Sequence, residues 1–190
     1  KNIPTRITSL GEFHQYFGGG PMTTFAVSAD ESTGFKVETD AASKFNLYRS
    51  LRMFFSNGGS TCYIVSVGDY SNGVNFKDLN DDAAESGIPT LLKYPEPTMV
   101  VIPDAVLLED NDCYEVQKAM LAHCGRDTNS RVAIIDVLNG DKPRTYDDED
   151  VIVKSREGVG NNFLQWGASY YPYLNTTIVQ GDEVDFSNIS

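Results

Sequence analysis

The sequence of 190 residues predicts an α/β protein with a mostly parallel sheet and helices on both of its faces. Several short runs are almost continuously apolar and rich in β-branched and aromatic residues, as strands buried on both sides are. Between these runs lie segments in which apolar residues recur at helical spacing. Buried strands that alternate with helices are typical of a parallel sheet, because helical crossovers connect parallel neighbours.

The first predicted helix begins at Ser9, which forms a capping box with Glu12. Leu10, Phe13 and Phe17 share one side of this short helix. The glycines and the proline of residues 18–21 end it.

Two short strands are expected next, at residues 25–29 and 35–39, where apolar and polar residues alternate. Residues 30–34 have the composition of a turn. The pair could form a hairpin or two separate sheet edges, and the pattern alone leaves both open.

A helix over residues 47–55 and a strand over residues 61–67 follow, separated by Asn57, Gly58 and Gly59. The apolar face of the helix is expected to comprise Leu47, Tyr48, Leu51, Phe54 and Phe55. The strand is nearly all apolar, so we expect it to be buried on both faces.

The second half of the chain alternates between predicted helices and strands. Helices are expected over residues 75–86, 112–124 and 147–156, the second of them closed by Gly125. Strands are expected over residues 98–102, 131–138 and 168–174. Residues 139–150 read as a long polar loop. The length and the absence of a convincing linker indicate a single domain over residues 1–190.

Charge and cysteine content restrict the partners of the protein. The formal net charge of −12 repels phosphate backbones and anionic lipid surfaces, so we expect no direct nucleic acid partner. No apolar run approaches the roughly 20 residues of a membrane span, so membrane insertion is not expected. Three cysteines, Cys62, Cys113 and Cys124, form no C-x-x-C pair, which favours a reduced compartment.

Asp104 and Asp136 are the sharpest candidates for chemistry, because each follows or ends an apolar strand. The carboxyl ends of parallel strands are where α/β proteins place ligands and catalytic carboxylates. No glycine-rich phosphate loop accompanies these residues, since none of the glycine clusters has the required spacing. The alternative interpretation, which we favour, assigns Asp104 to a turn and Asp136 to the end of its strand.

The other reactive residue types form no recognisable site. His14 and His123 lie far apart in sequence, and no G-x-S-x-G motif accompanies either one. Cys113, His123 and Cys124 lack the paired spacing and the fourth ligand of a zinc site. Residues 147–150 lack the interleaved pattern of a calcium loop and read as a solvated helix start. We therefore expect no catalytic, cofactor-binding or metal-binding residues.

Five segments, read in order, resemble the central domain of the contractile tail sheath proteins of phage tails and related injection systems. They are PTRITSLGEFHQYFGG, YRSLRMFFSNGGSTCYIVSVG, EPTMVVIPDAVLL, RVAIIDV and ASYYPYL. The match spans nearly the whole chain, and the pieces FFSNGGSTCYIVSVG and VVIPDAV are the most specific. Tyr173 is a departure, because the family often has tryptophan at that position.

The resemblance implies a structural protein and not an enzyme. It implies a subtilisin-like three-layer fold without a catalytic triad, and copies that assemble as hexameric rings stacked in a helical sheath. The implied partners are other copies, the inner tube protein, and baseplate and terminator proteins. The implied location is the bacterial cytoplasm during assembly and then a phage tail or an extracellular injection particle. Sheath subunits also carry an N-terminal arm and a C-terminal domain, so the chain is expected to be a fragment that lacks both.

Two alternatives remain open at this point. One is an α/β hydrolytic enzyme that uses Asp104 and Asp136, in which case these acids should converge with a histidine, a serine or a metal in one cleft. The other is a binding module that uses the polar loop at residues 139–150.

Overall fold

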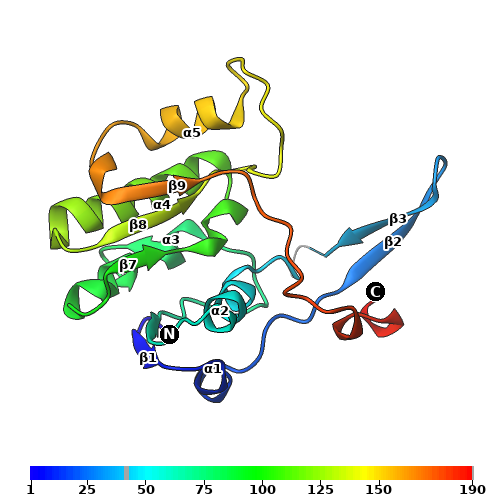
Figure 1. The fold of residues 1–190 in the computed structure, drawn as a ribbon, viewed down its shortest axis with the longest axis horizontal. Helices are drawn as coiled ribbons and strands as arrows, with labels where there is room; N and C mark the ends of the chain where they lie inside the picture. The colour runs from blue at the N-terminus through cyan, green and yellow to red at the C-terminus, as the bar shows by residue number, and fades with distance from the viewer. Residues whose placement is uncertain (41–42, 190) are drawn as a thin grey trace.

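The computed structural model describes residues 1–40 and 43–189 and has a mixed α/β fold (Figure 1). Its central element is a three-stranded parallel sheet in the order β7–β8–β9. These strands are β7 (Met99–Val101), β8 (Val132–Asp136) and β9 (Gly167–Tyr170). β7 and β8 lie within segments predicted as strands, and β9 begins one residue before the strand predicted over residues 168–174; each is shorter than expected. The predicted α/β class and parallel pairing are therefore confirmed.

One face of this sheet packs against α4 (Asp110–Ala122), and α5 (Val151–Val159) packs on α4 in turn. The side chains on this face, Val100, Ala133 and Ile135, are buried. They belong to the larger core, whose buried members are Leu79, Ile88, Val100, Ala105, Leu108, Cys113, Val116, Met120, Leu121, Cys124, Ala133, Ile135 and Leu138.

The opposite face of the sheet is exposed. Met99 is 60% exposed, Val101 is 50% exposed and Tyr170 is 58% exposed. The prediction that these strands are buried on both faces is therefore wrong for the described part of the chain. The apolar pattern of the strands suits a buried face on each side, but the described helices cover only one.

The helix predicted to close at Gly125 continues past that residue. After α4 the chain forms a π-helical segment over His123–Thr128 and ends at Asn129, whose φ is 52°. Gly125 is needed for a different reason, since a Cβ there would lie 2.5 Å from Cδ1 of Trp166. A small residue at this position lets the aromatic side chain pack on the helix.

The acidic helix predicted over residues 75–86 is mostly wrong. Only one turn forms, α3 (Phe76–Leu79), and two short strands follow, β5 (Asn80–Asp81) and β6 (Ser86–Gly87). A 3-10 helix over Ile88–Lys93 completes this region. Gly87 has a φ of 67°, and a Cβ there would clash with the Leu79 carbonyl, so the close return of β6 requires glycine.

The N-terminal part of the chain builds a second core. Strand β1 (Thr5–Ile7) pairs antiparallel with β4 (Cys62–Ile64), and α1 (Leu10–Phe17) and α2 (Leu47–Ser56) pack beside them. The buried residues of this core are Ile7, Phe13, Leu51 and Ile64. The strand predicted over residues 61–67 is therefore shorter than expected, has one fully buried side chain and lies outside the parallel sheet.

The capping predicted for α1 is present with one change. The Ser9 hydroxyl accepts a hydrogen bond from the Glu12 amide at 3.2 Å. The Glu12 carboxylate accepts from the amide of Thr8 at 2.6 Å, one residue before the N-cap. Gly18 ends the helix with a φ of 82°, as the glycine run predicts.

Strands β2 (Phe25–Asp30) and β3 (Gly34–Thr39) form an antiparallel hairpin that projects from the rest of the molecule (Figure 1). Of the two possibilities left open by the sequence, the hairpin is confirmed. The Asp30 carboxylate closes the turn by accepting hydrogen bonds from the hydroxyl of Ser32 and from the amides of Ser32 and Thr33, which keep its pKa low.

After β9 the chain crosses back toward α2 and the base of the hairpin (Figure 1). This segment contains 3-10 turns over Gly181–Glu183 and Phe186–Asn188. The side-chain amide of Asn188 donates to the Thr23 carbonyl at 2.7 Å, and Ile189 pairs with Phe25 in a parallel bridge. The predicted strand over residues 168–174 thus ends at Tyr170.

Candidate functional site

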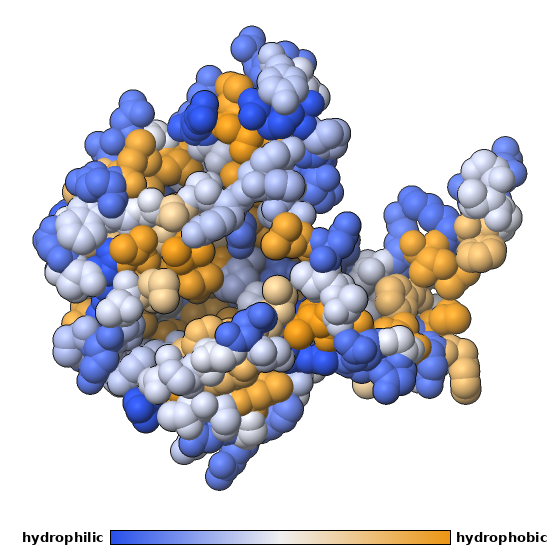
Figure 2. All heavy atoms as spheres, viewed as in Figure 1, coloured by the Kyte–Doolittle hydropathy of each residue, from blue (hydrophilic) through white to orange (hydrophobic). Residues whose placement is uncertain are grey.

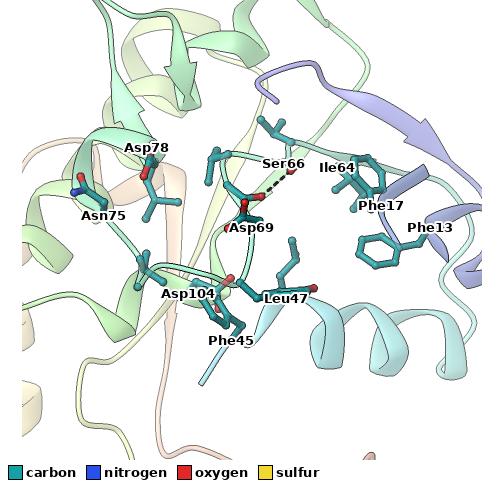
Figure 3. A pocket seen from close by; sticks show the side chains of 17 residues that line it. Phe13, Phe17, Phe45, Leu47, Ile64, Ser66, Asp69, Asn75, Asp78 and Asp104 are labelled. Carbon is teal, nitrogen blue, oxygen red and sulfur yellow. Dashed lines mark hydrogen bonds between the residues drawn. The ribbon is translucent and has the colours of Figure 1, made fainter. Parts of the chain in front are cut away.

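A cavity of about 240 Å³ lies between the N-terminal core and the larger core (Figure 3). Aromatic rings and three carboxylates are among the residues that line it. The aromatic members are Phe13, Phe17, Phe45 and Tyr70, and the acids are Asp69, Asp78 and Asp104. No histidine, lysine or arginine is among the described residues that line it.

The Asp104 carboxylate caps the start of α2. Its Oδ1 accepts a hydrogen bond from the Asn46 amide at 2.5 Å, and the Leu47 amide is also within reach. Asn46 donates its side-chain amide to the Pro103 carbonyl at 3.1 Å. Burial raises the pKa of Asp104, although these amides oppose the shift. The residue thus satisfies a helix N-terminus that has no local side-chain cap.

Asp136 lies elsewhere, at the carboxyl end of β8 on the exposed face of the sheet. Its backbone carbonyl accepts a hydrogen bond from the Gln117 side chain at 2.9 Å. Its carboxylate has no hydrogen-bond or ion-pair partner among the described residues, and burial raises its pKa. Asp104 lines the cavity between the two cores and Asp136 is not among its lining residues, so this cavity does not bring the two acids together.

Neither histidine forms a hydrogen bond or an ion pair with Asp104 or Asp136. His14 is exposed on α1, and its Nε2 lies 2.9 Å from the hydroxyl of Tyr48. His123 is buried after α4, where its Nε2 lies 2.7 Å from a guanidinium nitrogen of Arg131. Neither geometry resembles a nucleophile–base pair.

The three cysteines are free thiols in apolar surroundings. Burial raises the pKa of Cys113 to about 12 and that of Cys124 to about 11, which keeps both protonated near neutral pH. Cys62 is half-buried, and its pKa is raised for the same reason. Within residues 1–40 and 43–189, no group of three or more histidine, cysteine or acidic residues could hold a metal ion.

The acidic run at residues 147–150 contains one residue whose role the sequence analysis missed. Asp150 is completely buried and caps α5, accepting from the amide of Ile152 at 2.9 Å. It also accepts from the amides of Thr145 and Tyr146 and pairs with Arg144 at 2.6 Å. These donors hold its pKa well below the usual range. The helix begins at Val151, four residues later than predicted. An aspartate directly before an apolar run is a typical N-cap, so Asp150 could have marked this start in the sequence.

The hairpin presents an apolar surface that no described residue covers. In the register of β2 and β3, Val27 faces Val37 and Ala29 faces Phe35, so these side chains share one face. Phe35 is 62% exposed and Val37 is 51% exposed. We call Val27, Ala29, Phe35 and Val37 the hairpin face. Figure 2 shows hydrophobic residues gathered along the projecting hairpin.

The open side of the parallel sheet is a second apolar surface, and Figure 2 shows hydrophobic residues there as well. The register of the three strands places the side chains of this surface next to one another across the sheet. We call it the open sheet face, and it comprises Met99, Val101, Val132, Ile134, Ala168 and Tyr170. Exposed apolar surfaces are frequent interaction sites, so these two surfaces are the candidates for contacts with a partner.

Comparisons with known proteins add no assignment, because no protein family and no curated protein matched the chain. No helix among the described residues is long and apolar enough to cross a membrane. The features that bear on function are therefore the two apolar surfaces, the cavity and the separated acids.

Proposed function

We propose that this chain is a structural subunit of a contractile tail sheath, with the subtilisin-like fold of that family's central domain and no catalytic triad. Copies would bind head to tail in rings and stack around an inner tube. Two alternative packings of the same subunits would give an extended and a contracted state. Contraction would drive the tube through a target envelope.

The observation that carries this proposal is the hairpin face. A two-stranded hairpin is only marginally stable in water, and this one leaves Val27, Phe35 and Val37 exposed on one side. A neighbouring subunit that packs on the hairpin face would bury these side chains and stabilise the hairpin. Contact between unlike surfaces of identical copies is what builds rings and helices.

The proposed energy source is the assembly itself. Many modest interfaces would change together during contraction, so this domain would need no nucleotide, metal or other cofactor. Its further partners would be the inner tube, baseplate and terminator proteins. Assembly would take place in the bacterial cytoplasm, and the product would be a phage tail or an extracellular injection particle.

The hydrolase alternative finds less support. Its two acids, Asp104 and Asp136, are separated, and the described residues around each contain no histidine or serine in a catalytic arrangement. The alternative of a binding module at residues 139–150 is weakened because Asp150 turns part of that loop inward, onto Arg144 and the start of α5.

The test measures self-association by sedimentation velocity at low and high salt, followed by negative-stain microscopy of concentrated samples. We expect weak association at low salt, because each copy carries a charge of −12, and stronger association when salt screens this charge. Val27→Glu should weaken the association at least about tenfold, because it places a charge in the contact. Ser28→Glu adds the same charge to the opposite face of β2 and should have little effect.

Equal association of the two variants would show that the hairpin face is not the contact. A hydrolase screen provides the second test, in which Asp104→Asn and Asp136→Asn should abolish no turnover. An activity of the parent chain that either substitution removed would contradict the structural role and favour the enzyme.

A further inference from the structure

The open sheet face has the composition of a surface that is covered in the functional protein. Strands of an all-parallel sheet are normally buried on both faces, and apart from Asp136 the residues of β7 and β8 are apolar on both. The structure covers Val100 and Ala133 but leaves Met99 and Val101 on the other side in solvent. The strands thus carry an apolar side that the described residues do not use.

The dimensions of this face suit a single α-helix. Three strands spaced about 4.8 Å apart span about 10 Å, which matches the diameter of a helix with its side chains. Helices are also the elements that pack on parallel sheets, since their apolar stripe fits the twisted surface. A helix laid along β8 would contact Val132 and Ile134 beneath it and Met99 and Tyr170 on either side.

The charge on the open sheet face restricts which kind of helix could bind there. Asp136 is the one charged residue on the three strands, and it shares the open sheet face with Val132 and Ile134 because side chains alternate along β8. Asp136 is half-buried, and its carboxylate has no hydrogen-bond or ion-pair partner among the described residues. A covering helix would bury this carboxylate further, which is costly unless the helix supplies a cation.

A second copy of the same face is a poor complement. Two copies would bring two Asp136 carboxylates into one interface and would add the repulsion of two chains with charge −12. A positively charged partner, in contrast, is attracted by the negative charge of this chain.

We propose that the open sheet face binds an amphipathic α-helix whose apolar stripe covers Met99, Val101, Val132 and Ile134 and whose lysine or arginine pairs with Asp136. This interaction goes beyond the proposed function and does not depend on it, because it uses a different surface from the hairpin face. It predicts a helical, basic partner segment for the sheet.

The experiment uses the 190-residue chain and a synthetic amphipathic helix of about 18 residues built from leucine and lysine at helical spacing. Two comparison peptides carry glutamate in place of lysine, or the same leucines and lysines in scrambled order. Binding is followed by fluorescence anisotropy, and its location by methyl NMR. We expect the lysine helix to shift the methyl signals of Met99, Val101, Val132 and Ile134.

Variants locate the contact. Met99→Glu should weaken binding of the lysine helix at least about tenfold, because it places a charge in the apolar surface. Asp136→Asn should weaken it about fivefold and reduce the preference over the glutamate helix. Val37→Glu on the hairpin and Asp182→Asn on the exposed C-terminal segment are the controls, and both should leave binding unchanged.

Three results would overturn the inference. The first is equal binding of the lysine, glutamate and scrambled peptides. The second is the absence of shifts at these four methyl-bearing residues. The third is a concentration-dependent shift of the same methyls without peptide that Met99→Glu removes, which would assign the face to a second copy.

Discussion

Arg131 illustrates how single residues hold this structure together, because it is a buried cation that forms no ion pair within the described part of the chain. Its guanidinium donates to the carbonyl of Leu91 at 3.1 Å and also to that of Tyr94. Another of its nitrogens lies 2.7 Å from Nε2 of His123. Arginine can only donate, so Nε2 must accept, and the imidazole must be neutral. Through these contacts Arg131 joins the end of the Ile88–Lys93 3-10 helix to the segment directly after α4.

This arrangement predicts a loss of stability in acid. Burial, with the positive charge of Arg131, lowers the pKa of His123 from 6.5 to about 4. The unfolded chain therefore binds a proton at this histidine between pH 6.5 and 4, and the folded chain does not. The stabilisation is fully present above pH 6.5 and is lost as the pH falls toward 4, by about 3 kcal/mol in all.

Urea unfolding at several pH values measures this contribution. His123→Gln keeps an acceptor for Arg131 but cannot titrate, so its stability should fall less steeply over this range. His14→Gln, on the exposed side of α1, is the matched control and should follow the parent. Parallel curves for His123→Gln and the parent chain would show that the buried histidine does not titrate as inferred.

At the scale of elements, α2 shows how far helical spacing predicts a buried face. Leu51 is buried in the N-terminal core, as predicted. Phe54, assigned to the same face, is 38% exposed and packs against Phe55 and Gly59. The apolar stripe is wider than the surface that β1, β4 and α1 offer, so its edge remains in solvent.

The two residues should therefore differ in their effect on stability. Leu51→Ala should cost about 3 kcal/mol, because it leaves a cavity in a small core. Phe54→Ala should cost about 1 kcal/mol, because much of its ring is already in contact with water. Chemical denaturation of both variants measures which loses more free energy of unfolding. An equal loss of stability would place Phe54 in the core.

At the scale of the whole molecule, the C-terminal segment connects regions that are distant in sequence. Arg52 on α2 pairs with Glu183 through two short contacts, at 2.6 and 2.7 Å. Asn188 and Ile189 reach the base of the hairpin. This segment therefore places the hairpin face relative to the N-terminal core.

Removing the ion pair should loosen that segment without unfolding the protein. In Arg52→Ala, backbone amides over residues 180–189 should exchange with deuterium about tenfold faster, while the amides of α4 and β8 keep their protection. Arg6→Ala removes an exposed arginine from β1 and serves as the control. Faster exchange in α4 as well would mean that the C-terminal segment stabilises the whole fold.

Much of the fold could be predicted because its signals are local. The capping box at Ser9, the alternation in the hairpin strands, the helical spacing through α2 and α4 and the apolar runs of β7 and β8 each appear within one short window. Local signals also placed the turn at Asp30, which accepts hydrogen bonds from residues two and three positions away. Neighbours in sequence supply the physical cause in each case.

The sequence by itself thus determined the class of the protein, its acidic charge and the identity of most elements. The tertiary structure alone decided that Asp104 caps a helix whose first amide lies 58 residues away, and that Asp136 lies unpaired on the open sheet face. It also placed β4 beside β1 and left one side of the parallel sheet uncovered. These outcomes depend on which distant surfaces meet, and an apolar residue carries the same local signal whether or not another element covers it.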